Sequence, residues 1–384
     1  MLKRLHLKNF TVFADADFEF SPGLNVLVGT NGTGKSHVLK LGYAVESISF
    51  SLNKEAVKEA AKEVANKDSE TFVKKPKELY SGQFAWMFRL KDLLPEIFRS
   101  GSLNSLINWN TNQQARIAVA LGEYEREEID FRIHNKIGNS DSVIRVNEVP
   151  SEMKNIDGAV FIPARDILTL SWILPGSEQL VLPLEKNYLD LLNQLRLLPL
   201  RNSESREAIT ALTDIVGGEV RAEGDTYFLV DTTGRRVPIN MVAEGLRKFG
   251  TLQKLLANGS LTKNTTLYWD EPEANLNPAL LRKLAAILAE LARQGFQIIL
   301  ATHSTDLLKE FHILSRQKDA QPLPIKYFGL NAEPGEATRI VSTDNFEYLP
   351  DVVALSEELK QADELEEIFI REDREYYANN RGEE

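Results

Sequence analysis

The chain contains no cysteine among its 384 residues, which excludes disulfide bonds, thiolate metal sites and cysteine nucleophiles. Long apolar runs are also missing, since the longest, such as residues 296–301, are far too short to cross a bilayer. No long apolar stretch follows the basic residues near the N-terminus, so a secretory signal is not expected. These absences predict a cytoplasmic protein with no membrane partner.

Basic residues are outnumbered, with 45 Lys and Arg against 56 Asp and Glu, for a net charge of −11. A uniformly basic surface for nucleic acid is therefore not expected. Local basic stretches at Lys74–Lys77 and Arg196–Arg206 leave DNA open as a partner, although solvated faces explain them better. The hydrophobic content of 43% is ample for a sizeable core, and the length suggests about two structural units.

Strands and helices alternate at both ends of the chain but not in its middle. The pattern predicts an α/β fold in which one nucleotide-binding core is interrupted by a large mixed α/β insertion. We expect the core in residues 1–48 and 241–355, the insertion in 49–240, and an acidic, solvated helical tail in 356–384. The insertion should begin with a charged helix over Asn53–Asn66. Two hairpins are predicted in it, Asp130–Ile137 with Val143–Val146 and Tyr227–Asp231 with Arg236–Ile239.

A glycine-rich segment matches the pattern G-x-x-x-x-G-K-[ST] and joins a predicted strand, Leu24–Val28, to a predicted helix. The predicted nucleotide-binding residues are Gly29, Thr30, Asn31, Gly32, Thr33, Gly34, Lys35, Ser36 and the adjoining His37, whose side chain by itself suits packing. Glycines let successive backbone N–H groups face phosphates, and the helix presents its positive end to them. Lys35 should reach the β- and γ-phosphates of ATP, and the Ser36 hydroxyl should bind Mg²⁺.

Two carboxylates, Asp270 and Glu271, follow the apolar strand Thr266–Trp269. At such a strand end the first typically holds Mg²⁺, and the second can orient the attacking water and accept its proton. Neighbouring side chains of a strand point to opposite faces, so the two should have different roles. A charged pair at the start of a surface turn is the simpler explanation, but the phosphate-binding motif favours ATP hydrolysis to ADP and phosphate.

His303 follows the next predicted strand, Phe296–Ala301. This position would let it touch the γ-phosphate of ATP or the attacking water. A histidine that caps the start of the following helix is the competing explanation.

Together these segments resemble the ABC-type ATPases, in particular the branch with SMC-like, RecF-like and OLD-like bacterial AAA-family proteins. The resemblance rests on Lys8-Asn9-Phe10, the phosphate loop, Asp270 to Pro278 and Ala301 to Ser304, and Phe161 to Arg165 also fits the group. It implies an ATP-sandwich dimer or higher oligomer, and often a separately encoded nuclease or toxin-like effector in phage defence.

The resemblance also implies a signature loop that completes the ATP site of a second subunit. Its candidate residues are Ala243, Glu244 and Gly245, and the loop Asn275–Asn277 would link the two sites. Transporter ATPases usually carry serine where Ala243 stands, so Arg247 or Lys248 would have to compensate. An ordinary amphipathic helix explains the first segment equally well, and a helix N-cap at Asn277 explains the second. Gln83 is a candidate for the glutamine loop of the family.

Four functions compete. The first is an ATP-gated switch acting on an effector, a nuclease or DNA. The second is a RecF-like DNA repair ATPase, which the acidic net charge disfavours. A transporter subunit is disfavoured by the long insertion and the missing serine, and a scaffold that binds ATP without turnover is disfavoured by Glu271.

Overall fold

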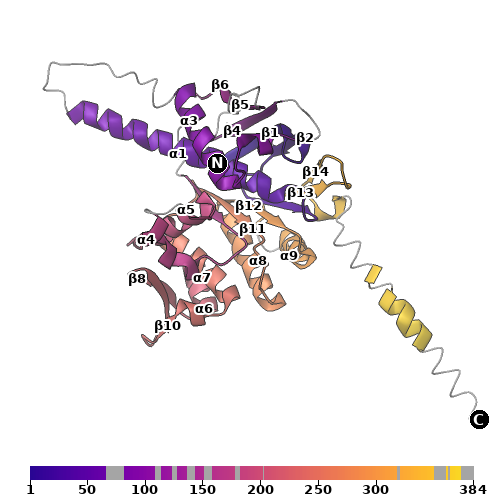
Figure 1. The fold of residues 1–384 in the computed structure, drawn as a ribbon. Helices are drawn as coiled ribbons and strands as arrows, with labels where there is room; N and C mark the ends of the chain where they lie inside the picture. Colours follow the sequence, from indigo (N-terminus) through magenta and orange to yellow (C-terminus); the bar gives the residue numbers. More distant parts are fainter. Residues whose placement is uncertain are drawn as a thin grey trace, which may run out of the picture.

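The computed structural model describes residues 1–65, 82–108, 114–122, 128–135, 143–150, 158–177, 182–201, 203–317, 321–349, 360–361 and 364–372. Two sheets organise it, one largely parallel and one antiparallel, with a small third sheet at the far end (Figure 1). Among these residues no helix is long and apolar enough to span a membrane.

The parallel sheet forms the centre of the molecule. Its strands, in spatial order, are β14 (Arg339–Thr343), β13 (Ile325–Asn331), β3 (Leu24–Gly29), β12 (Gln297–Thr302), β11 (Thr266–Asp270) and β7 (Ala159–Ile162). Only the edge strand β14 runs antiparallel to its neighbour. The apolar runs in β3, β11 and β12 are buried almost throughout, as expected for strands covered on both faces. All three end at the same edge of the sheet, where functional side chains of α/β proteins gather.

The antiparallel sheet covers one side of this centre. Its order is β2 (Phe13–Glu19), β1 (Leu2–Phe10), β4 (Ala115–Leu121), β5 (Glu128–His134) and β6 (Val143–Glu148). The small third sheet holds β10 (Arg236–Pro238), β9 (Thr226–Val230) and β8 (Glu219–Glu223). Both predicted hairpins are confirmed as antiparallel pairs, β5 with β6 and β9 with β10, although residues 136–142 between the first pair lie outside the described residues.

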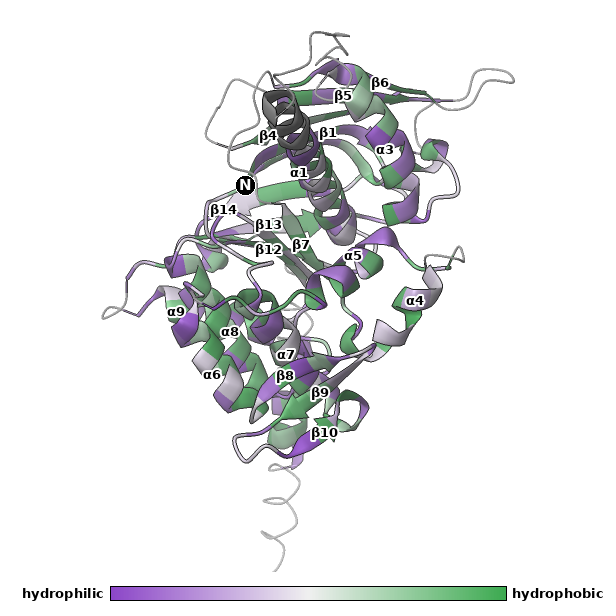
Figure 2. Ribbon diagram, turned by 90° about the vertical axis from the view of Figure 1, so that its left-hand side faces the viewer, coloured by the Kyte–Doolittle hydropathy of each residue, from purple (hydrophilic) through white to green (hydrophobic). Residues whose placement is uncertain are grey.

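The helices pack on both faces of the parallel sheet. They are α1 (Lys35–Ala65), α3 (Gln83–Phe98), α4 (Leu174–Ser177), α5 (Lys186–Leu195), α6 (Arg206–Val216), α7 (Glu244–Ala257), α8 (Pro278–Arg293) and α9 (Thr305–Ser315). Short 3₁₀ turns occupy Leu103–Leu106, Leu168–Ile173, Ile239–Met241 and Phe346–Tyr348. Helices α1 and α3 share a buried apolar cluster with the antiparallel sheet, and α5 to α9 share a second cluster on the opposite face. Figure 2 shows green, hydrophobic residues along α8 and in the central strands, and the buried ones belong to these clusters.

Helix α1 differs from the sequence-based expectation. The sequence predicts one helix after the glycine-rich segment and a separate one at Asn53–Asn66, but a single helix of 31 residues, Lys35–Ala65, contains the first and the described part of the second. Asn66 lies outside the described residues. Residues 48–52 contain neither glycine nor proline, so nothing in the backbone ends the first helix there.

The middle of the chain contributes strands to both large sheets. Strands β4, β5 and β6 extend the sheet begun by β1 and β2, and β7 pairs in parallel with β11 at the edge of the central sheet. Described segments within residues 49–240 are therefore built into both large sheets, and the start of this range, residues 49–65, belongs to helix α1. The described residues of the acidic tail, 360–361 and 364–372, are helical and exposed.

Candidate nucleotide site

The loop between β3 and α1 has the conformation of a phosphate cradle. Gly32 and Gly34 have φ angles of +84° and +91°, which side chains rarely tolerate. Any Cβ on Gly34 would also lie 2.6 Å from the side chains of Val12 and Phe13, and one on Gly29 would lie 2.3 Å from the carbonyl oxygen of Leu330. The sequence thus has glycine where both backbone shape and close packing demand it.

Lys35 lies inside this loop. Its ammonium group donates to the carbonyl oxygens of Gly29 at 2.7 Å and of Thr30 at 2.8 Å, while the Thr33 hydroxyl also donates to Thr30 at 2.9 Å. Burial lowers the pKa of Lys35, and the nearby carboxylates of Asp270, Glu271 and Glu273 oppose that shift. Asn31 and Gly32 stay exposed at the tip of the loop. A buried cation within a glycine-rich loop at the start of a helix suits a polyphosphate.

Ser36 and Asp270 meet although 234 residues separate them. The Ser36 hydroxyl donates to Asp270 Oδ2 at 2.8 Å. Burial raises the pKa of Asp270, and the Ser36 hydrogen bond opposes this shift. A hydroxyl and a carboxylate are hard oxygen ligands of the kind that Mg²⁺ accepts together with water and substrate phosphates. No group of three or more acidic, histidine or cysteine side chains that could hold a metal occurs within the described ranges.

Glu271 occupies a turn immediately after β11. Its φ angle is +45°, a conformation that costs free energy in a residue other than glycine and that is enriched at functional sites. Its N–H group donates to the carbonyl oxygen of Ala301 in β12 at 2.9 Å, which ties the turn to the neighbouring strand. Its side chain is 35% exposed, so water can reach it.

His303 follows β12 and faces the same turn. Strands β11 and β12 are hydrogen-bonded neighbours, as the sequence predicted, with Asp270 opposite Ala301. His303 Nδ1 lies 3.6 Å from Glu271 Oε1 and 3.7 Å from Glu273 Oε1. The imidazole is half exposed and thus open to a ligand.

Glu273 also lies in this site, but the sequence analysis did not single it out as a candidate residue. Its Oε1 accepts hydrogen bonds from the Thr302 hydroxyl at 2.6 Å and from the backbone N–H of His303 at 3.1 Å. The buried Glu273 thereby fixes the segment that carries His303. Its place two residues beyond the acidic pair was the only sequence signal, and nothing in the sequence showed that it would reach β12.

Comparison with known proteins identifies the kind of domain that this chain carries. Residues 121–309 match the family described as "AAA domain, putative AbiEii toxin, Type IV TA system", and residues 4–41 match a second family described as "AAA domain". The chain carries an ABC-type AAA ATPase domain. The predicted resemblance and the α/β fold are both confirmed.

Curated relatives match this ATPase domain only over short segments. The DNA replication and repair protein RecF of Streptococcus uberis is 48% identical over 42 residues, which is 11% of this chain and 12% of that protein. RecF of Desulfitobacterium hafniense is 38% identical over 55 residues, or 14% of this chain and 15% of that protein. The aligned part is thus under a sixth of the length of these relatives.

A solved structure shows the same fold over most of the ATPase chain. It is described as the "SmcHead bound to the C-winged helix domain of ScpA", with a TM-score of 0.50 and 15% identity over 90% of this chain and 98% of that one. At this identity the likeness concerns the fold alone.

The candidate signature residues of the ATPase lie at the start of α7. Ala243 is exposed, whereas Glu244 and Gly245 contact the chain's own loop after β11. Glu244 Oε1 accepts from Asn275 Nδ2 at 2.8 Å, and a Cβ on Gly245 would lie 2.9 Å from the carbonyl oxygen of Asn275. Gly245 therefore permits close packing within one chain, and its contact with a second subunit stays a prediction.

Three other candidate residues have structural contacts away from the phosphate loop. The His37 ring packs beside Phe98, at 5.7 Å between centroids, and burial lowers its pKa to about 4. Gln83 donates to the carbonyl oxygen of Asn147 in β6, at the far edge of the antiparallel sheet. Asn277 caps α8 by accepting from the N–H group of Leu280 at 2.9 Å.

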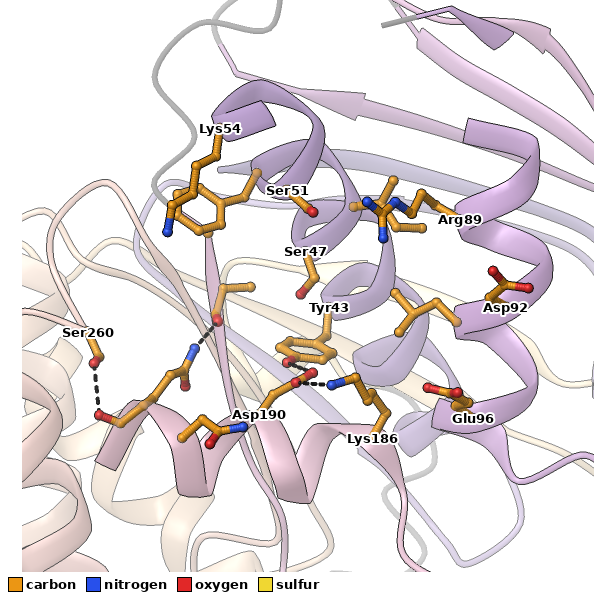
Figure 3. A pocket seen from close by; sticks show the side chains of 17 residues that line it. Tyr43, Ser47, Ser51, Lys54, Arg89, Asp92, Glu96, Lys186, Asp190 and Ser260 are labelled. Atoms are coloured by element: carbon orange, nitrogen blue, oxygen red, sulfur yellow. Dashed lines mark hydrogen bonds and ion pairs between the residues drawn. The ribbon is translucent and has the colours of Figure 1, made fainter. Parts of the chain in front are cut away.

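A separate cavity of about 650 Å³ lies between α1, α3 and α5. Figure 3 shows its polar lining, in which Tyr43 and Lys186 both donate to Asp190, at 2.9 and 2.7 Å. None of its lining residues belongs to the phosphate loop or to the segments after β11 and β12.

Proposed function

We propose that this protein is an ATP-hydrolysing switch that closes with a second copy of itself, or in a higher oligomer, around ATP and thereby controls a separate effector or nuclease. The observation that carries the proposal is the convergence at one sheet edge of Lys35, Ser36 and Asp270 with the strained, water-accessible Glu271. A protein that only bound ATP would have no need for a carboxylate held at positive φ beside the phosphate loop.

The residues divide the chemistry among them. The loop N–H groups and Lys35 hold the phosphates and offset their charge. Mg²⁺, when held by Ser36 and Asp270, offsets further phosphate charge. Glu271 orients a water molecule for attack on the γ-phosphorus and takes its proton as the bond to the bridging oxygen of ADP breaks. His303 is placed to contact the γ-phosphate or that water.

A second copy would complete the site through the start of α7. This helix of 14 residues begins beside the exposed Ala243, and the positive end of a helix attracts phosphate. Closure on ATP and opening after hydrolysis would then give the protein two states.

The solution mass of Glu271→Gln with and without ATP and Mg²⁺, measured by light scattering after size exclusion, tests the switch. A nucleotide-dependent increase to a dimer or larger assembly is expected. An unchanged mass would contradict the closure mechanism but would not affect the assignment of the ATP site.

The partner is proposed to be a separate protein. The matching family description names a putative toxin of a type IV toxin–antitoxin system, and the SMC head of similar fold was solved with a domain of another protein, ScpA. Both descriptions favour a role in which ATP state is passed to an effector, for example in antiviral defence.

A RecF-like role on DNA is the second candidate, favoured by the short RecF matches. Binding of labelled duplex DNA, followed by anisotropy across a salt series, separates the two. Tight binding that weakens steeply with salt would favour DNA. No binding of DNA at low salt would favour an effector protein as the partner.

A further inference from the structure

Lys248 is a buried lysine of α7 that touches the turn carrying the catalytic carboxylate. It is 3% exposed, and its ammonium group donates to the carbonyl oxygen of Glu271 at 3.1 Å and lies 3.4 Å from that of Pro272. Burial lowers the pKa of Lys248, and the opposing charges that raise it come from Glu273, Glu244, Glu271 and Asp166. A buried ammonium is costly unless its donors are used, and here they are used on backbone oxygens.

These contacts tie the turn to helix α7, whereas its other backbone contact ties it to β12. The N–H group of Glu271 is bound to Ala301 in β12, and its carbonyl oxygen is bound to Lys248 in α7. The peptide units on both sides of a residue at φ +45° are thus fixed by different elements. A strained conformation persists only where the surroundings over-determine it. Lys248 restrains the carbonyl oxygen of Glu271 together with the N–H group of Ala274, which donates to the same oxygen at 3.1 Å.

Helix α7 is itself anchored at several points. Arg247 Nε lies 3.1 Å from Asp166 Oδ2, in the segment after β7, and both side chains are largely buried. Gly245 packs against Asn275, and Glu244 binds the side chain of the same residue. A shift of α7 would therefore displace the turn that carries Glu271.

We propose that Lys248 is a positioning residue that holds Glu271 in its hydrolytic orientation and links the position of α7 to the rate of ATP hydrolysis. The inference rests on the proposed function, since it requires Glu271 to act in hydrolysis. The proposal gives helix α7 a second role. Besides carrying the candidate signature residues at its start, α7 would act within the ATP site of its own chain.

Lys254 provides the matched control. It lies on the same helix, is 5% exposed, and burial also lowers its pKa. Its ammonium group lies over the ring of Tyr227, 5.6 Å from the centroid. Tyr227 belongs to β9, in the small third sheet, and not to the nucleotide site. Any general effect of removing a buried lysine from α7 should appear in Lys254→Met as well.

The experiment compares Lys248→Met, Lys248→Arg and Lys254→Met with the parent protein. We measure kcat for ATP hydrolysis and the Kd for ATP by calorimetry, with thermal unfolding as a check of folding. Lys248→Met should lower kcat about tenfold or more with Kd nearly unchanged, because Glu271 is misplaced while the phosphate loop is intact. Lys248→Arg, which keeps a cationic donor, should recover part of the rate, and Lys254→Met should retain the parental kcat.

Non-additivity gives the sharper readout. In a Glu271→Gln background, Lys248→Met should cause little further loss, because both changes act through one carboxylate. A kcat for Lys248→Met no lower than that of Lys254→Met would overturn the inference, as would an undiminished effect in the Glu271→Gln background. If Lys248→Met fails to fold, Lys248→Gln takes its place with the same expectations. Normal hydrolysis by Glu271→Gln alone would instead count against the proposed function.

Discussion

Acidic and hydroxyl side chains gather at both ends of strand β11, but those at one end are fully buried and those at the other lie partly open to solvent. At its beginning, the carboxylate of Glu46 is completely buried and accepts hydrogen bonds from Thr266 at 3.0 Å and Tyr268 at 2.9 Å. At its far end, Asp270 and Glu271 lie partly open to solvent beside a strained turn. Helix α1 serves both ends, through Glu46 in one case and Ser36 in the other.

The contrast separates a polar cluster that stabilises the fold from one that is suited to chemistry. Both oxygens of Glu46 have partners, and burial raises its pKa. At the other end, Glu273 Oε2 is buried without a hydrogen-bond partner within the described part of the chain, and Glu271 is in a costly conformation. Incomplete pairing and strain are typical of functional sites, so substitutions at the two ends should affect different measurements.

The largest effect is expected for Lys35→Ala. Removing the buried cation from the phosphate loop should abolish ATP binding or turnover, because the phosphate charge loses its main side-chain partner. Calorimetric ATP titration and phosphate release measure it. Unchanged turnover in a variant that unfolds at the parental temperature would overturn the assignment of the site.

Glu271→Gln should come next. The amide keeps the size of the side chain but cannot take the proton from water, so hydrolysis should slow by about 10²–10⁴-fold. ATP affinity should stay near the parental value, and thermal stability should not fall. Near-normal turnover would move the water-orienting role to another residue, and a large loss of stability would contradict the separation of the two ends.

Of the two ends of β11, the one with Asp270 and Glu271 was easier to predict from the sequence. The motif around Lys35 and the apolar strands before Asp270 and His303 are local patterns, and the carboxyl ends of neighbouring parallel strands must meet. The sequence-based placement of His303 beside the acidic turn is therefore found in the fold. The roles of these residues stay predictions.

What the sequence did not predict depends on contacts between distant segments. Glu46 lies in an unremarkable helical stretch, and its burial depends on how α1 crosses β11. The bonds of Lys248 to the Glu271 turn depend on the angle at which α7 approaches it. Likewise β7 joins the central sheet from within the middle of the chain, which no local pattern could show.

Tyr268→Phe tests the end of β11 at which Glu46 is buried. It removes the hydroxyl that donates to Glu46 and should lower the free energy of unfolding by about 1–3 kcal/mol, since a buried carboxyl oxygen loses its partner. Tyr327→Phe is the matched control, because this equally buried hydroxyl has no hydrogen-bond partner among the described residues. Denaturant unfolding measures both. Equal losses for the two variants, or a clear fall in ATP turnover with Tyr268→Phe alone, would break the distinction.

The smallest effect concerns His37, which follows the phosphate loop yet packs like a core residue. Its pKa is lowered from 6.5 to about 4, chiefly by burial and further by Lys40. Between these values the unfolded chain binds more protons than the folded protein, so this residue stabilises the fold above about pH 6.5 and loses that contribution as pH falls toward 4. His37→Leu should therefore show a smaller drop in Tm between pH 7.5 and pH 5 than the parent protein does. An identical drop would mean that the imidazole is protonated without cost and open to solvent, in which case it could face the nucleotide and not the apolar core.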